Sequence, residues 1–207
     1  MNPPFKVVKN VVPESHANFL YEYINIRYEA TKHLYKEKLV TEEPIHGTFD
    51  NDPKTLGAYV LYGDPAFDLL MINLLEKVKS ESGEDLIPMS SYARLYFKDH
   101  ELSGERPTGR GPENITAAIH LGSEGSPKIW PFYVKSPEGE TFQADLGVGD
   151  MVLYVGECKH SRESCEHDFY GQVMAHYTKK GMGKMLDGRS HLGLPKQYFQ
   201  TEWLGQK

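Results

Sequence analysis

Residues 90–98, SSYARLYFK, mark the point at which the hydrophobic pattern of this 207-residue chain changes. Aromatic and basic side chains alternate there with small and apolar ones, and a period of two residues is typical of a β-strand. Further strand-like runs follow, separated by turn signals such as GSEGSP, SPEGE and GVGD. These runs are NITAAIHL (114–121), KIWPFYV (128–134), TFQADL (141–146), DMVLYVG (150–156) and YGQVMAHYT (170–178).

The sequence before residue 86 has helical spacing instead. A first helix is expected over residues 13–36. Asp64 followed by Pro65 predicts the start of a second helix, because aspartate caps free backbone N–H groups and proline fits the first helical position; Gly83 should end it. Residues 38–63 are broken by glycine and proline and predict loop with short strands. Helices followed by many strands predict an α+β fold that is mainly β, with the helices on one side of a barrel or sandwich.

The composition narrows the class of protein. The chain suits one domain, and its net charge of −6 argues against nucleic acid as a partner. No apolar run approaches the roughly 20 residues that span a bilayer, so no membrane partner is expected. Cys158 and Cys165 are too few for a disulfide framework, which favours a reducing, cytoplasmic location.

Several segments together resemble a known family. They are YGDPAFDLLM (62–71), LIPMSSYARLYFK (86–98), WPFYV (130–134), GDMVLYVGECKHSRE (149–163) and YGQVMAHYT (170–178). Over roughly residues 60–195 the chain is similar to the 2-oxoglutarate- and iron(II)-dependent oxygenases, and within them to a small prolyl-hydroxylase-like group met in bacteria and phages. The resemblance implies a double-stranded β-helix, which is a cupin-like jelly roll, with N-terminal helices packed on one sheet. It divides a single domain, 1–207, into a helical and loop buttress (about 1–85), a β-helix core (about 86–180) and a tail (181–207).

That family holds iron(II) with two histidines and one carboxylate, which leaves three positions open for 2-oxoglutarate and oxygen. The resemblance makes His160 the distal histidine, because HSRE after the apolar run 150–155 fits the family's spacing. The proximal His-x-Asp pair, however, is missing from this chain.

Two alignments of the proximal loop are open. Anchoring on the Arg-Pro dipeptide at 106–107 puts Ser103 and Glu105 at the two ligand positions, whereas anchoring on ENIT (113–116) puts Pro107 and Gly109 there. Neither alignment supplies a histidine, and Glu105 is the only carboxylate. Iron held by His160 and Glu105 alone should bind weakly.

The sequence offers two alternative metal sites. Cys158, His160, Cys165 and His167 spell C-x-H-x4-C-x-H, and thiolate with imidazole suits zinc, although four ligands this close need a very tight loop. His120, in HLG, invites comparison with the His-x-Gly of iron halogenases. A histidine at the end of a strand is more often a hydrogen-bonded structural group.

The cosubstrate of such oxygenases is held by a basic side chain helped by hydroxyl groups, and arginine pairs with carboxylates through two hydrogen bonds. Candidates for this role are Arg94, Tyr92, Tyr96 and Arg162. An arginine between two tyrosines on a strand requires an anionic partner if it faces a core. An internal ion pair with an acidic residue of the chain would serve equally well.

Two functions follow from these residues. The missing proximal pair favours a non-catalytic relative that keeps the barrel as a binding or structural module, with a protein or peptide partner; a phage protein, in a host cytoplasm or a virion, is one setting by fold analogy. The alternative is an active dioxygenase with Fe(II) and 2-oxoglutarate as cofactors, hydroxylating a peptide or a small molecule.

Overall fold

The computed structural model describes residues 4–41, 46–51, 53, 55–107 and 111–188, with the backbone alone for 103–107 and 188. The last part of the expected tail, 189–207, and Gly109 of the proximal loop lie outside this description. The helical segments are α1 (Glu14–Lys36), α2 (Pro65–Asn73), α3 (Leu75–Ser82) and the short 3-10 segment η2 (Met185–Gly188). The strands are β1 (Phe5–Val8), β2 (Thr48–Phe49), β3 (Tyr59–Tyr62), β4 (Leu86–Phe97), β5 (Leu102–Pro107), β6 (Asn114–Glu124), β7 (Phe132–Lys135), β8 (Thr141–Ala144), β9 (Met151–Val155), β10 (Lys159–Arg162) and β11 (Phe169–Lys179).

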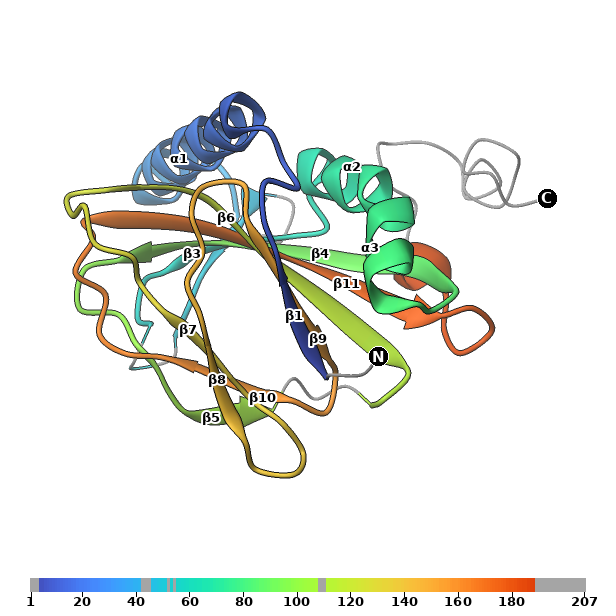
Figure 1. The fold of residues 1–207 in the computed structure, drawn as a ribbon. Coiled ribbons are helices and arrows are strands. Elements are labelled where there is room, and N and C mark those ends of the chain that lie inside the picture. The colour runs from blue at the N-terminus through green and yellow to red at the C-terminus, as the bar shows by residue number, and fades with distance from the viewer. Residues whose placement is uncertain (1–3, 42–45, 52, 54, 108–110, 189–207) are drawn as a thin grey trace.

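The strands form two sheets that face each other (Figure 1). The large sheet has the order β1-β9-β6-β11-β4-β3-β2, and the small sheet has the order β5-β10-β7-β8. From β4 to β11 the chain passes back and forth between the two sheets, and the pairings are antiparallel. This is the topology of a jelly roll, so the predicted fold class is confirmed.

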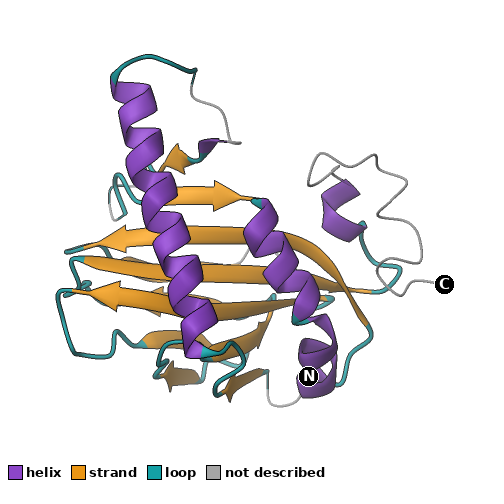
Figure 2. Cartoon of the chain, turned by 90° about the horizontal axis from the view of Figure 1, so that it is seen from above, coloured by secondary structure: helices purple, strands orange, loops and turns teal. Residues whose placement is uncertain are grey.

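Helices cover one face of the large sheet, as Figure 2 shows, and the main apolar core lies between them and that sheet. Tyr21 of α1 lies directly over Gly122 of β6 and Gly171 of β11, where an added Cβ would come within 2.7 Å of its ring. Asp64 accepts a hydrogen bond from the Ala66 N–H at the start of α2 and pairs with Arg27 of α1 at 2.7 Å. These contacts fix both helices on the sheet. None of the described helices is long and apolar enough to cross a bilayer.

The second helix differs from the prediction of one continuous segment. It is interrupted at Leu74 (φ −84°, ψ −6°), which separates α2 from α3, and it ends as expected at Gly83 in the left-handed conformation (φ 72°). Leu70 before the interruption and Val78 after it are both buried in the same core. The interruption therefore keeps both segments on the sheet, a tertiary requirement that sequence spacing does not express.

Two strands lie where the sequence indicated loops. β5 runs through the glycine- and proline-rich stretch after residue 101, and β10 contains His160. β10 lies between β5 and β7, and its register pairs His160 with Arg106 on one side and Val134 on the other. Both strands are short and mostly polar, so they carry no apolar period, and only the neighbouring strands define them.

The turn before β9 is held by Asp150. Its carboxylate accepts hydrogen bonds from Lys9 Nζ at 2.8 Å, the Asn10 N–H at 2.9 Å and the Gly147 N–H at 2.7 Å. Gly149 next to it has φ 80°, and a Cβ there would meet the Val12 carbonyl oxygen. The GD pair at 149–150 thus joins the N-terminal strand to the jelly roll.

Replacing Asp150 with alanine should lower the free energy of unfolding by about 1–3 kcal/mol, because the partly buried N–H groups of Asn10 and Gly147 lose a charged acceptor. Burial alone would raise the pKa of Asp150, but hydrogen bonds from Lys9, Asn10 and Gly147 outweigh it and lower that pKa. The contribution is therefore present above the ordinary carboxyl pKa and is lost as the pH falls through the lowered pKa. Urea unfolding at several pH values measures this, with exposed Asp145→Ala as control; equal losses in both variants would contradict it.

Candidate functional site

His160 lies inside the barrel, against aromatic rings. Its ring is 5.6 Å from that of Phe132 on β7, nearly parallel at 13°, and 5.8 Å from that of Tyr154 on β9. Phe132 and Tyr154 are fully buried members of an apolar cluster that also contains Val134 and Met174. The imidazole predicted as the distal ligand therefore has an aromatic and aliphatic surrounding.

The described residues contain no group of three or more His, Cys, Asp or Glu side chains that could hold a metal ion. The side chain of Glu105 lies outside the description, but the backbone register sets Arg106, not Glu105, opposite His160. The cysteines of the zinc alternative are buried in different clusters, Cys158 near Phe132 and Cys165 near Trp130. The chemistry of this donor set does not fit the two-histidine, one-carboxylate pattern that iron(II) requires.

Arg162, two residues further along β10, is buried with 2% exposure. Its guanidinium group donates to the Trp130 carbonyl oxygen at 2.5 Å, to Gln172 Oε1 at 2.7 Å and to the Tyr170 hydroxyl at 3.3 Å. It also lies 4.3 Å from the Trp130 ring centroid and 4.7 Å from that of Tyr170. No carboxylate of the described residues pairs with it, so its charge is stabilised only by neutral acceptors and aromatic faces.

Arg94 has a different set of partners. Its Nη2 atom forms an ion pair with Asp50 at 3.0 Å and donates to the Tyr92 hydroxyl at 2.7 Å. The guanidinium group also lies 5.3 Å from the ring of Tyr96. The internal ion pair considered from the sequence is therefore present, and the partner is Asp50.

Four side chains on the inner face of the barrel have a buried N–H or O–H group without an acceptor in the described structure. These atoms are Arg94 Nε, Tyr96 Oη, Arg162 Nε and Gln172 Nε2, which we call the donor cluster. Gln172 and Arg94 are directly paired across β11 and β4, and Gln172 Oε1 already accepts from Arg162, which leaves its NH2 group as the free end. Buried donors without partners are rare in folded proteins, and all four here call for an acceptor.

The sequence indicated three of these four residues. Arg94 and Tyr96, with Tyr92, alternate with apolar residues on one strand, and Arg162 is a basic residue close to His160. Sequence reasoning did not select Gln172, although that residue shares the alternation of β11 with Tyr170 and Met174. Nor did it select Trp130, whose carbonyl oxygen and ring both contact Arg162. The sequence feature that could have identified Gln172 as a site residue is that it is a glutamine within the otherwise largely apolar strand β11.

His120 lies beside the donor cluster and is neutral at physiological pH. Its ring stacks on Tyr170 with centroids 4.2 Å apart, and Nδ1 lies 3.2 Å from the Leu146 carbonyl oxygen, which assigns the proton to Nδ1. Burial, and next the charge of Arg162, lower the pKa of His120 to about 4. This is the hydrogen-bonded structural histidine considered from the sequence, not a residue of the proximal loop.

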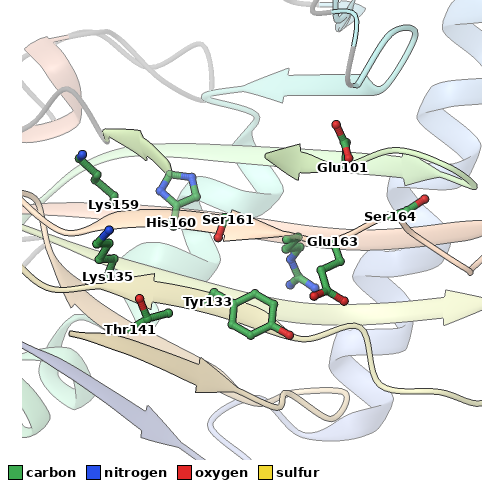
Figure 3. Close-up of a pocket in the computed structure, with 10 residues that line it drawn as sticks. Glu101, Tyr133, Lys135, Thr141, Lys159, His160, Ser161, Glu163 and Ser164 are labelled. Atoms are coloured by element: carbon green, nitrogen blue, oxygen red, sulfur yellow. The ribbon is translucent and has the colours of Figure 1, made fainter. Parts of the chain in front are cut away.

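A groove lies on the outer face of the small sheet (Figure 3). Its volume is about 480 Å³, and its walls come from the start of β5 and from β7, β8 and β10. The lining residues include Tyr133, Lys135, Lys159, Ser161 and Glu163. His160 and Arg162 of β10 also line this groove, although both contact aromatic side chains of the interior, Phe132 and Trp130 respectively.

Arg162→Gln should raise the pKa of His120, because it removes a nearby positive charge while the burial remains. In the parent protein, the unfolded state binds the His120 proton first as the pH falls, so the fold loses stability from about pH 6.5 toward the folded value. NMR titration of the imidazole nitrogens measures the pKa. Arg27→Gln, on α1, is the control and should leave His120 unchanged; an unchanged His120 pKa in Arg162→Gln would contradict the electrostatic coupling.

Comparisons with known proteins connect this architecture to solved structures. No protein-family model matches the chain, and no curated protein does. The non-heme α-ketoglutarate-dependent epimerase SnoN from nogalamycin biosynthesis matches with a TM-score of 0.61 at 13% identity, over 85% of this chain and 78% of that one. A Pseudomonas putida prolyl-4-hydroxylase matches with a TM-score of 0.54 at 13% identity, over 86% and 94%. HygX from Streptomyces hygroscopicus, solved with nickel, 2-oxoglutarate and hygromycin B, matches with 0.60 at 14% identity, over 91% and 88%.

Identities this low show the fold alone, and the residues that act in those proteins do not transfer to this chain. The likeness nevertheless covers helices and both sheets, since each match extends over more than four fifths of the chain. This chain therefore has the double-stranded β-helix fold of the 2-oxoglutarate- and iron(II)-dependent oxygenases.

Proposed function

We propose that this chain is a non-catalytic relative of those oxygenases that binds a small carboxylate in the interior of the barrel. The observation that carries the proposal is the donor cluster: four buried donors converge on the inner face without an acceptor. Two of the four belong to guanidinium groups, whose fork of N–H groups matches a carboxylate. A carboxylate would satisfy several of these donors at once.

The surroundings of His160 support the loss of catalysis. Phe132 stacks on the imidazole and Tyr154 lies tilted beside it, and the described residues around it do not complete a metal-binding set. In the strand register the partner of His160 is Arg106, not Glu105. Iron(II) is well solvated in water and needs several protein ligands to compete, so His160 alone would hold it weakly.

The charge balance of the interior supports an anionic ligand. Arg94 is neutralised by Asp50, whereas Arg162 has only neutral acceptors and aromatic rings. A buried cation without a counter-ion is costly, and an anion that pairs with it recovers part of that cost. The cluster therefore favours ligands with a carboxylate over neutral or cationic molecules of the same size.

Calorimetric titration with 2-oxoglutarate in the absence of metal tests the proposal. We expect saturable binding that persists in His160→Ala and weakens at least about tenfold in Gln172→Glu. The glutamate would give Arg162 an internal counter-ion and repel the ligand, while the fold keeps its packing. Exposed Gln143→Glu, on β8, adds the same charge outside the barrel and should leave the affinity unchanged.

Two results would overturn the proposal. One is the absence of binding by 2-oxoglutarate, succinate and acetate at millimolar concentration. The other is a visible metal-to-ligand charge-transfer band when iron(II) and 2-oxoglutarate are added to the anaerobic protein. That band, lost in His160→Ala, would instead support an active dioxygenase.

A further inference from the structure

A second groove lies between α1 and the large sheet, beside the end of β6 and the start of β11, and we call it the helix groove. Figure 2 shows α1 lying across the strands of this sheet. The volume of the helix groove is about 700 Å³, within the range of about 300–1,000 Å³ that is usual for ligand pockets. None of its described lining residues belongs to the donor cluster, so the helix groove is a separate candidate site.

One face of α1 forms the long wall of the helix groove. Asn18, Glu22, Asn25 and Glu29 all line it. They are three or four residues apart, which sets them in one stripe along a helix. With a rise of 1.5 Å per residue, the stripe is about 16 Å long. Because these side chains stand on a regular helix, the wall is arranged before any ligand arrives, which reduces the ordering cost of binding.

The helix groove is acidic. Its described lining includes Glu22, Glu29 and Glu124 but no lysine or arginine. Glu29 is paired with Lys32 at 2.8 Å, and the Lys32 ammonium group also lies 4.7 Å from the ring centroid of Tyr28, another lining residue. The uncompensated charge therefore comes from Glu22 and Glu124. Two carboxylates without a cation attract a positively charged ligand.

The hydroxyl group of Tyr21 lines the same groove without a hydrogen-bond partner. Tyr21 is 7% exposed, and its Oη atom forms no hydrogen bond within the described residues. Burial raises the pKa of Tyr21, the Asn25 amide lowers it in part and the Glu124 charge raises it, so the hydroxyl group keeps its proton. The ring lies over Gly122 and Gly171, which fixes its place on the strands. A ligand with an N–H group would satisfy this buried oxygen.

We propose that the helix groove binds a primary ammonium group carried on a short apolar chain. Glu22 and Glu124 balance the charge of the ammonium group, and Tyr21 Oη accepts one of its N–H groups. The apolar chain covers the side chain of Ile26, which is 68% exposed, and the ring of Phe169. Removing this apolar surface from water favours a chain-bearing ammonium ion over ammonium itself.

A primary ammonium ion fits the helix groove better than other cations do. The described residues contain no group of three metal-ligating side chains, which argues against a metal ion. A quaternary ammonium ion has no N–H group and would leave the Tyr21 hydroxyl oxygen unsatisfied. The inference goes beyond the proposed function, because it uses none of the donor cluster and needs no ligand in the barrel.

Amide NMR on the full chain at neutral pH tests the proposal. The probe is n-pentylamine, which is protonated there, and the matched neutral compound is n-pentanol. We expect saturable shifts of the amides of Tyr21, Glu22, Ser123 and Glu124 with n-pentylamine, and at least about tenfold weaker binding of n-pentanol. Raising the salt concentration should weaken the amine, because the carboxylates of the site are exposed to solvent.

A second comparison identifies the source of the ammonium group. Acetyl-lysine-methylamide carries the same group on a peptide unit. Tighter binding of this compound than of n-pentylamine would support the proposal with a lysine side chain of a partner protein as the occupant, and weaker binding would support it with a free amine.

Variants separate the specific site from general attraction. Tyr21→Phe removes only the hydroxyl group and should weaken n-pentylamine at least about fivefold while leaving pentyltrimethylammonium unchanged. Glu22→Gln with Glu124→Gln should weaken both cations at least about tenfold. Glu14→Gln, on α1 outside the groove, removes one charge as a control and should change neither.

Four results would overturn the proposal. They are equal affinity for n-pentylamine and n-pentanol, shifts confined to another face, no shift at about 20 mM amine, and unchanged affinity in the double glutamine variant. If Tyr21→Phe loses its folded amide spectrum, the two glutamate positions still decide the outcome, because their side chains are exposed and their replacement leaves the core intact.

Discussion

The burial of the Arg162 guanidinium group is the constraint on which the inner end of the barrel depends. A charged group out of water is costly unless hydrogen bonds and polarisable surfaces replace the lost hydration. Trp130, Tyr170 and Gln172 supply these, two of them through their rings as well as through oxygen atoms. The aromatic residues of this region are therefore required by the charge as well as by the volume that they fill.

The interior of the barrel is divided into two unlike regions. Around His160, aromatic and aliphatic side chains exclude other metal donors from the described structure. Around Arg162, hydrogen-bond donors outnumber acceptors. Among the described residues, the second region has donors that a carboxylate would satisfy, and the first has no set of three metal-ligating side chains.

The sequence correctly predicted the helices and strands that are specified by residue patterns within the element itself. The long strands β4 and β11 and the helix α1 agree with their periodicity, and Asp64 and Gly83 mark helix ends as expected. The short polar strands β5 and β10 were missed, because their existence depends on neighbours far away in the chain.

The same distinction applies to the candidate site. Arg94 was recognisable as a cation on an apolar strand and Arg162 as a basic residue close to His160, but periodicity could not say that Asp50 neutralises the former and that no described carboxylate neutralises the latter. Such pairings join residues 44 positions apart, as between Asp50 and Arg94, or join different sheets, as between Gln172 and Arg162. These pairings follow from the topology of the two sheets, which cannot be deduced from composition or from the spacing of residues in the sequence.

The shortness of β10 has a thermodynamic consequence. This strand has four residues, all of which line the groove of the small sheet, and His160 and Arg162 also contact aromatic side chains of the interior. Its backbone is hydrogen-bonded to β5 on one side, where the register shifts between His160 and Arg162, and to β7 on the other, so a displacement of this backbone is transmitted to both neighbours. Occupants of the groove and of the interior thus share one mechanical element, and any free-energy coupling between them must be equal in both directions.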